Sequence, residues 1–282
     1  MCWRKKVTTK KKLKIGLLFL TLSFLIIFYF KDDFLFSSFS YNNRFLSKVF
    51  LKLGANIDGK DSYGYPLIHY AVISKNKENV DFLIRRNANL NVKDKNGTTP
   101  LKMAIIVGNL DIVKLLVENG AKMNEDSSNR LPILTATLKD QVEIVKYLFK
   151  YSEMASLDKV TLIGHVFYNS NLELLKFFNK NGVEITFKPL TSLVHQKTNE
   201  KKAIEMLKFL IAKGANLNEK RCMQRTLLMS SAIWHKNEVL DFLLKNGVNK
   251  NIKDDEGKTA LDWARLNRNE KGALILEKFQ VE

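Results

Sequence analysis

A repeat with a period of 33 residues is the feature that most constrains how this chain can fold. The stretch DSYGYPLIHYAVISKNKENVDFLIRRNANLN begins at Asp61, and DKNGTTPLKMAIIVGNLDIVKLLVENGAKMN begins at Asp94. The pairs that carry the register are Asp61 with Asp94, Gly64 with Gly97, Ala71 with Ala104, Val80 with Val113, Leu83 with Leu116, Ala88 with Ala121 and Asn91 with Asn124. A period of this length indicates similar structural units that stack along the chain.

Each unit has the sequence signals of two short antiparallel helices. Thr99 can cap a helix N-terminus, and Pro100 suits the first helical position because it has no N–H to leave unpaired. Gly120 can end the second helix in the left-handed conformation that glycine adopts at little cost. The apolar face of the unit would consist of Leu101, Ala104, Val113 and Leu116. One unit cannot bury such a face alone, so neighbouring units must pack against it.

The same pattern recurs along most of the chain. The closing glycine returns as Gly54, Gly120, Gly182, Gly214 and Gly247, with Asn87 and Ser152 in the two intervening places. Between about Leu162 and Lys213 the helix-opening motif is lost, and the run HQKTNEKK from His195 predicts a polar loop or a lengthened junction. We expect about six full repeats within residues 44–282, with a half-repeat at Arg44–Asn56 and a cap from Lys258 onward.

The two end motifs of the repeat resemble the ankyrin-repeat family. The opening Thr-Pro-Leu-x-x-Ala stands at Thr99–Ala104, and the closing Gly-Ala-x-x-Asn stands at Gly120–Asn124. The resemblance implies an all-α ankyrin-repeat solenoid of stacked helix-turn-helix units with short fingers between repeats. It also implies binding of protein partners rather than catalysis.

An apolar run precedes the repeats. Residues 15–30 carry no charge, and counting Leu13 and Lys14 the run would make about 27 Å of helix, against a hydrocarbon core of about 30 Å. Residues 1–14 are rich in Lys and Arg, which favours a cytoplasmic N-terminus. We therefore expect a basic n-region at 1–14, a transmembrane signal-anchor helix at 15–30 in contact with the lipid bilayer, and a tether at 31–43. The repeat domain would lie outside the cytoplasm.

Two alternatives to an anchor remain open. A basic region before an apolar run is also the pattern of a cleaved signal peptide, with Ser38 and Ser40 as the small residues of a poor cleavage site. Cleavage there would release a soluble, secreted protein of repeats. The run could also be a buried helix of a soluble fold.

The charge of the chain is strongly positive, at +17. This excess raises the alternative of electrostatic binding to nucleic acid or to an anionic membrane. Lysines do not cluster in the sequence, however: Lys77, Lys93, Lys95 and Lys114 alternate with Glu78, Asp81, Asp94 and Asp111. The mixing makes nucleic acid an unlikely partner. With two cysteines, Cys2 and Cys222, no disulfide framework is expected.

The sequence gives no reason to expect an enzyme, a metal site or a cofactor. Four histidines, His69, His165, His195 and His235, fall in different repeats without the spacing of metal ligands. Known catalytic and phosphate-binding motifs are missing from the sequence. His69 occupies the histidine position of the family's opening motif, where the resemblance implies a bond to backbone.

Candidate partner-binding residues follow from the resemblance, because ankyrin domains bind with their finger tips and the exposed face of each first helix. In this register they are Tyr63, Tyr65, Ile73, Lys95, Asn96, Thr98, Ile106, Val107, Arg130, Arg225 and Trp234. Tyr, Trp and Arg are common interface anchors. We predict a groove with an apolar floor and a lysine-rich rim, suited to a partly acidic protein. The alternative is that the apolar members pack against adjacent repeats.

Overall fold

The computed structural model describes residues 23, 25–26, 29–40, 43–123, 131–151, 158–220 and 224–279. The chain divides into two compact units, Met1–Pro132 and Ile133–Glu282. The helices of the first unit are α2 (Lys31–Ser40), α3 (Arg44–Lys52), α4 (Leu67–Ile73), α5 (Lys77–Ile84), α6 (Pro100–Ile106) and α7 (Leu110–Glu118).

The second unit is also built from short helices. After α8 (Pro132–Leu138), which begins at the division, come α9 (Val142–Phe149), α10 (Lys159–Tyr168), α11 (Leu172–Lys180), the 3₁₀ turn η1 (Leu190–Leu193), α12 (Glu200–Ala212), α13 (Leu227–Ile233), α14 (Asn237–Lys245), α15 (Ala260–Leu266) and α16 (Glu270–Lys278). The described part is thus all-α in its regular elements, as the repeat predicted.

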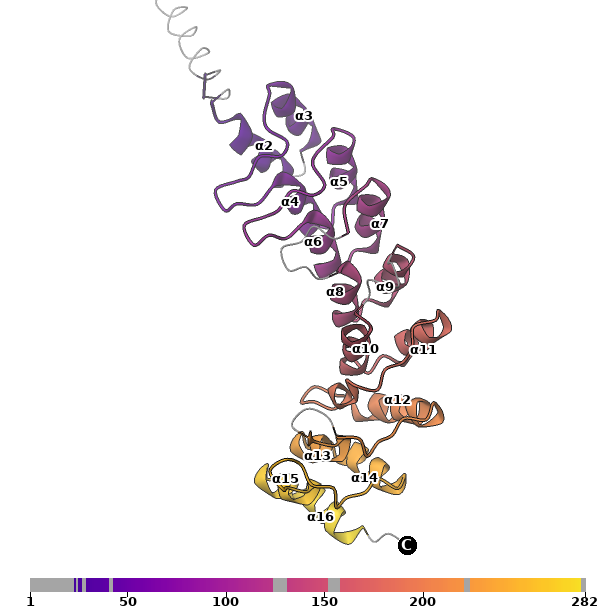
Figure 1. The fold of residues 1–282 in the computed structure, drawn as a ribbon. Coiled ribbons are helices and arrows are strands. Elements are labelled where there is room, and N and C mark those ends of the chain that lie inside the picture. Colours follow the sequence, from indigo (N-terminus) through magenta and orange to yellow (C-terminus); the bar gives the residue numbers. More distant parts are fainter. Residues whose placement is uncertain are drawn as a thin grey trace, which may run out of the picture. The chain divides into compact units, whose positions relative to one another are not determined.

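Within the first unit, the helices form two rows, which Figure 1 shows. The first helices α4 and α6 lie in one row beside α2, and the second helices α5 and α7 lie in the other beside α3. The finger loops that precede α4 and α6 extend from the first row, away from the second. The fingers and the first helices therefore share one side of this unit.

The predicted caps and apolar faces are confirmed. The Thr99 side chain accepts a hydrogen bond from the Lys102 amide, and Pro100 begins α6. The residues expected to form the apolar face are almost completely buried: Leu101, Ala104, Val113 and Leu116. Burying one leucine side chain contributes about 1.5–3 kcal/mol, so the face that each repeat presents to its neighbours is the main source of stability.

A ladder of side-chain to backbone hydrogen bonds links the loops that follow the second helices. Asp58 accepts from the Asn89 amide at 2.8 Å, and Asn91 accepts from the Lys122 amide at 2.8 Å. In the second unit Asn218 accepts from the Asn249 amide at the same distance. Asn91 and Asn218, which close their repeat motifs, and Asp58 in the corresponding position are therefore acceptors that join one repeat to the next.

The segment expected to be a tether differs from that expectation, because residues 31–40 form the helix α2. Leu35 and Phe39 are buried, and α2 packs against α3 and α4. Asp32 also accepts a hydrogen bond from the Asn56 amide at 2.7 Å, which extends the ladder to α2. The expected half-repeat at residues 44–56 is thus the second helix of a complete pair. The helix was missed because α2 lacks both the threonine cap and the opening motif.

The irregular middle contains a shortened repeat. Helices α10 and α11 form a normal pair, but the next first helix is replaced by the single turn η1, which packs against α10 and α13. Pro189 comes so close to Gly164 of α10 that a Cβ at Gly164 would stand 3.3 Å from the proline ring. The second helix of this repeat, α12, is correspondingly long at 13 residues. Its cap is Asn199, within the run predicted to be a loop or junction.

The predicted anchor at residues 15–30 lies mostly outside the described residues, as does the whole of the basic region at 1–14. Among the helices that the structure does describe, none is both long enough and apolar enough to cross a membrane.

Candidate binding surface

Three of the fingers in the described residues are each shaped by an aspartate that accepts hydrogen bonds from the backbone of its own turn. The Asp61 Oδ1 atom accepts hydrogen bonds from the amides of Tyr63, at 3.0 Å, and Tyr65, at 2.8 Å. Asp94 repeats the arrangement, with 2.8 Å to the amide nitrogens of both Asn96 and Thr98. These aspartates hold the backbone at the finger tips, so the neighbouring side chains are presented by a fixed scaffold.

Glycine is required at the tip of the first finger for two reasons. Gly64 has a φ of +79°, which lies in the left-handed region that other residues enter at a cost. A Cβ at Gly64 would also stand only 3.1 Å from the Lys95 Cβ of the next finger. The two fingers therefore pack side by side with no room for a larger residue.

Whether the second carboxylate oxygen of a finger aspartate accepts a side-chain hydrogen bond depends on the residue nine positions later in the sequence. Tyr70 donates its hydroxyl hydrogen bond to Asp61, and the Trp263 Nε1 atom donates to Asp254 at 2.7 Å. In the finger of Asp94 the corresponding residue is Met103, which has no such donor. The buried Asp94 Oδ2 atom has no hydrogen-bond partner among the described residues. The sequence analysis missed this relationship, although a tyrosine or tryptophan nine residues after the aspartate is visible in the sequence.

These contacts change the acidity of the finger groups. Burial raises the pKa of Asp61, but hydrogen bonds from Tyr70 and from the backbone outweigh it, so the pKa lies below its usual value. The hydrogen bond to Asp61 raises the pKa of Tyr70 to about 12. For Asp254, burial is likewise outweighed by hydrogen bonds from the Lys258 amide and Trp263, and its pKa is lowered.

The predicted residues of the first unit lie in the two fingers and at the C-terminal ends of the first helices. Tyr63 is 69% exposed, and Ile73 and Ile106, at the ends of α4 and α6, are 44% and 39% exposed. Tyr65 is half-buried, and the Lys95 Nζ atom lies 5.5 Å from the centre of its ring. We call this the finger surface; its members are Tyr63, Tyr65, Ile73, Lys95, Asn96, Thr98, Ile106 and Val107.

Two of the predicted residues in the second unit have different environments. Trp234 ends α13 and is 44% exposed. Arg225 instead is mostly buried, with its guanidinium 4.0 Å above the centre of the Trp263 ring and ion pairs of 3.8 Å to Asp254 and 3.7 Å to Glu256. Its side chain therefore packs against the next finger and pairs with its carboxylates. The remaining predicted residue, Arg130, lies outside the described residues.

The histidines link neighbouring repeats. The His69 Nε2 atom lies 2.8 Å from the Thr98 backbone oxygen, so the expected bond to backbone is present but reaches the next finger. His165, His195 and His235 contact backbone oxygens of other repeats, at 3.1, 2.9 and 2.9 Å. Within the described residues, no group of three or more His, Cys, Asp or Glu side chains could hold a metal ion.

Helix pairs, fingers shaped by aspartates and a ladder of Asp and Asn acceptors between repeats define a protein of stacked helix-pair repeats. A family model for ankyrin repeats in three copies matches residues 68–160, 162–254 and 194–280. The chain belongs to the ankyrin-repeat family.

Solved structures agree with this fold. The crystal structure of the human ASB11 ankyrin repeat domain is 22% identical, with a TM-score of 0.64, and the alignment covers 76% of this chain and 98% of that one. The ankyrin repeat domain of Bcl-3, described as a unique member of the IkappaB protein family, is 20% identical, with a TM-score of 0.53 and coverage of 74% and 97%. At these identities the likeness shows the fold alone. No curated protein matches the chain.

Proposed function

We propose that the chain binds a protein partner through the finger surface, without catalysis. The observation that carries the proposal is the exposure of Tyr63, in a finger, and of Ile73 and Ile106, at the ends of the first helices, in a unit whose finger backbone is held by Asp61 and Asp94. Exposed apolar and aromatic side chains on a rigid scaffold lose little conformational entropy on binding, which favours affinity. An interface of standard size would bury about 800 Å² of this surface.

The chemistry of the surface favours a partner with some acidic residues. Lys95 stands over the Tyr65 ring at the centre of the surface, where it can pair with a carboxylate while the aromatic and isoleucine side chains provide apolar contact. Trp234 extends the proposal to the second unit. Arg225 is a weaker candidate because its guanidinium is already engaged with Trp263 and Asp254.

The test compares the proteins recovered by three forms of the full chain from its native cells. The finger variant carries Tyr63→Ala, Ile73→Ser and Ile106→Ser. The control carries Tyr151→Ser, just after the second helix α9, and Leu274→Ser, in the second helix α16, which are also exposed. A protein bound by wild type and control should lose at least about thirtyfold in affinity for the finger variant, as expected for interface anchors worth 2 kcal/mol or more. Equal affinity for all three forms would rule out the finger surface. Recovery of a nucleic acid that high salt releases would support the electrostatic alternative.

We further propose that residues 15–30 anchor the chain in a membrane, with the repeats outside the cytoplasm. The packing of α2 argues against cleavage after Ser40, because such cleavage would remove the buried Leu35 and Phe39 and expose the apolar sides of α3 and α4. Protease protection of native membranes, followed by N-terminal sequencing, tests this. An intact membrane-bound chain whose repeats are digested only from the non-cytoplasmic side fits the anchor. A soluble chain beginning near Tyr41 would mean an exported protein instead.

A further inference from the structure

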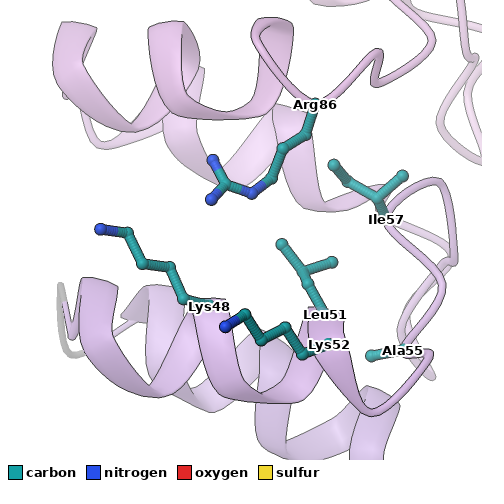
Figure 2. Close-up of a pocket in the computed structure, with 6 residues that line it drawn as sticks. All are labelled: Lys48, Leu51, Lys52, Ala55, Ile57 and Arg86. Atoms are coloured by element: carbon teal, nitrogen blue, oxygen red, sulfur yellow. The ribbon is translucent and has the colours of Figure 1, made fainter.

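A basic pocket lies in the first unit, between α3 and the loop that follows α5. It is a hollow of about 390 Å³ lined by Lys48, Leu51, Lys52, Ala55, Ile57 and Arg86. Figure 2 shows Arg86 extending from one wall toward α3, from which Lys48 and Lys52 extend on the other side, with Leu51 between them and Ile57 on the loop at one side. Three cations and a small apolar floor thus surround one space.

The positive charges of the basic pocket are not neutralised within the described part of the chain. Lys48 and Lys52 have no carboxylate within ion-pair distance there, and Arg86 is held by its stack on the Phe82 ring, at 3.8 Å, and by the Phe82 backbone oxygen, at 3.5 Å. The adjacent Arg85 differs, since it pairs with Asp81 at 2.8 Å. Neighbouring cations without a counter-charge repel one another, and a bound anion relieves that repulsion.

Exposed apolar side chains adjoin these cations on α3. Phe45 is 74% exposed and Leu46 is 39% exposed. Phe45, Lys48 and Lys52 are spaced three and then four residues apart, so they follow one face of the helix. A helix face that combines lysines with an exposed phenylalanine is typical of segments that lie on a membrane surface.

We propose that the basic pocket and Phe45 form a docking site for an anionic phospholipid membrane. The pocket takes the phosphate of one lipid headgroup, and Phe45 enters the boundary between headgroups and acyl chains. The apolar run that ends at Phe30 precedes this helix closely in the sequence, which would place α3 near a bilayer if the run is inserted. A nucleic acid would instead need a longer track of cations, and an acidic peptide alone gives no role to Phe45.

The experiment measures how fast each lysine of the full-length chain reacts with an amine-specific reagent, read by mass spectrometry. The chain is reconstituted in vesicles of phosphatidylcholine, or of phosphatidylcholine mixed with phosphatidylglycerol. The N-terminal run is the same in both samples, so its insertion does not affect the comparison. Lys201 and Lys208, exposed residues of α12, serve as internal references.

We expect Lys48 and Lys52 to react at least fivefold more slowly in the anionic vesicles than in the neutral ones. Their rates in neutral vesicles and in detergent should be alike. Arg86→Gln should weaken the protection by about fivefold, which corresponds to the roughly 1 kcal/mol that one cation contributes near an anionic membrane. Arg85→Gln, the matched control, should leave it unchanged. Phe45→Ser should weaken it without changing the pocket.

Several results would overturn the proposal. Equal reactivity of Lys48 and Lys52 in the two kinds of vesicle would exclude the site. If Lys201 and Lys208 were protected equally, the protection would come from a general attraction of the positively charged chain to the anionic membrane, and not from this site. If soluble glycerophosphate, duplex DNA or polyglutamate protects the two lysines without vesicles as strongly as the anionic membrane does, the occupant is a soluble anion, a nucleic acid or an acidic protein.

Discussion

At the scale of single residues, the finger aspartates determine the geometry of the proposed binding surface. The three fingers with described aspartates share the bonds to backbone but differ at the second oxygen: it accepts from Tyr70 in Asp61 and from Trp263 in Asp254, and in Asp94 it has no hydrogen-bond partner among the described residues. A single substitution should therefore have different effects in different fingers, depending on that partner.

Asp254→Asn should destabilise the second unit by about 1–3 kcal/mol, because the new amide cannot both accept from the Trp263 Nε1–H and satisfy the two backbone donors. Urea unfolding of the full chain, followed by far-ultraviolet circular dichroism, which reports on the helices of both units, gives the value. Asp94→Asn is the matched control, with a smaller expected loss because its second oxygen has no donor to lose. Equal losses at the two positions would contradict the role assigned to Trp263.

The lowered pKa values of Asp61 and Asp254 predict how stability depends on pH. A carboxyl group whose pKa is lower in the folded state stabilises the fold above its unfolded value of about 3.9, and this contribution is lost as the pH falls through the folded value. The free energy of unfolding should therefore decrease as the pH is lowered below about 4. The difference between wild type and Asp254→Asn should shrink over the same range, and a difference independent of pH would contradict the assignment.

At the scale of elements, α2 belongs to the repeat stack. Phe39 is buried, with its ring centre 5.8 Å from that of Phe82. Phe39→Ala should destabilise the first unit by about 3–5 kcal/mol, measured by hydrogen exchange of the amides in α4 and α5. Phe45→Ala, which removes a side chain that is largely exposed, should change stability by less than about 0.5 kcal/mol. A neutral Phe39→Ala would mean that α2 is indeed a tether.

The shortened repeat around η1 should open before its neighbours in the second unit. A four-residue turn has few backbone hydrogen bonds of its own, and the long segment between α11 and α12 is held mainly by side chains, among them the buried Leu190 and Leu193. Amides of residues 185–198 should exchange with deuterium at least tenfold faster than those of α13 and α14. Uniform exchange across these elements would show that the irregular repeat is as stable as the regular ones.

At the scale of the whole molecule, the repeat pattern in the sequence was enough to predict the family, the helix pairs and the buried faces. Thr99, Pro100 and Gly120 carry local signals that the structure confirms, because caps and turns are decided by neighbouring residues. Two features could not be predicted this way. The packing of α2 and the stacking of Arg225 on Trp263 depend on contacts between residues distant in sequence, and no local motif indicates such contacts.

We propose that the finger surface, and not the row of second helices α3, α5 and α7, contacts a protein partner. Site-specific photo-crosslinking in the native cells tests it most directly, with a photoreactive amino acid at Tyr63 or Ile106 and, as the control, at Arg85, which is exposed at the end of α5. We expect one defined protein adduct from both finger positions and none from Arg85. Adducts of the same protein from Arg85 alone, or equally from all three positions, would contradict it.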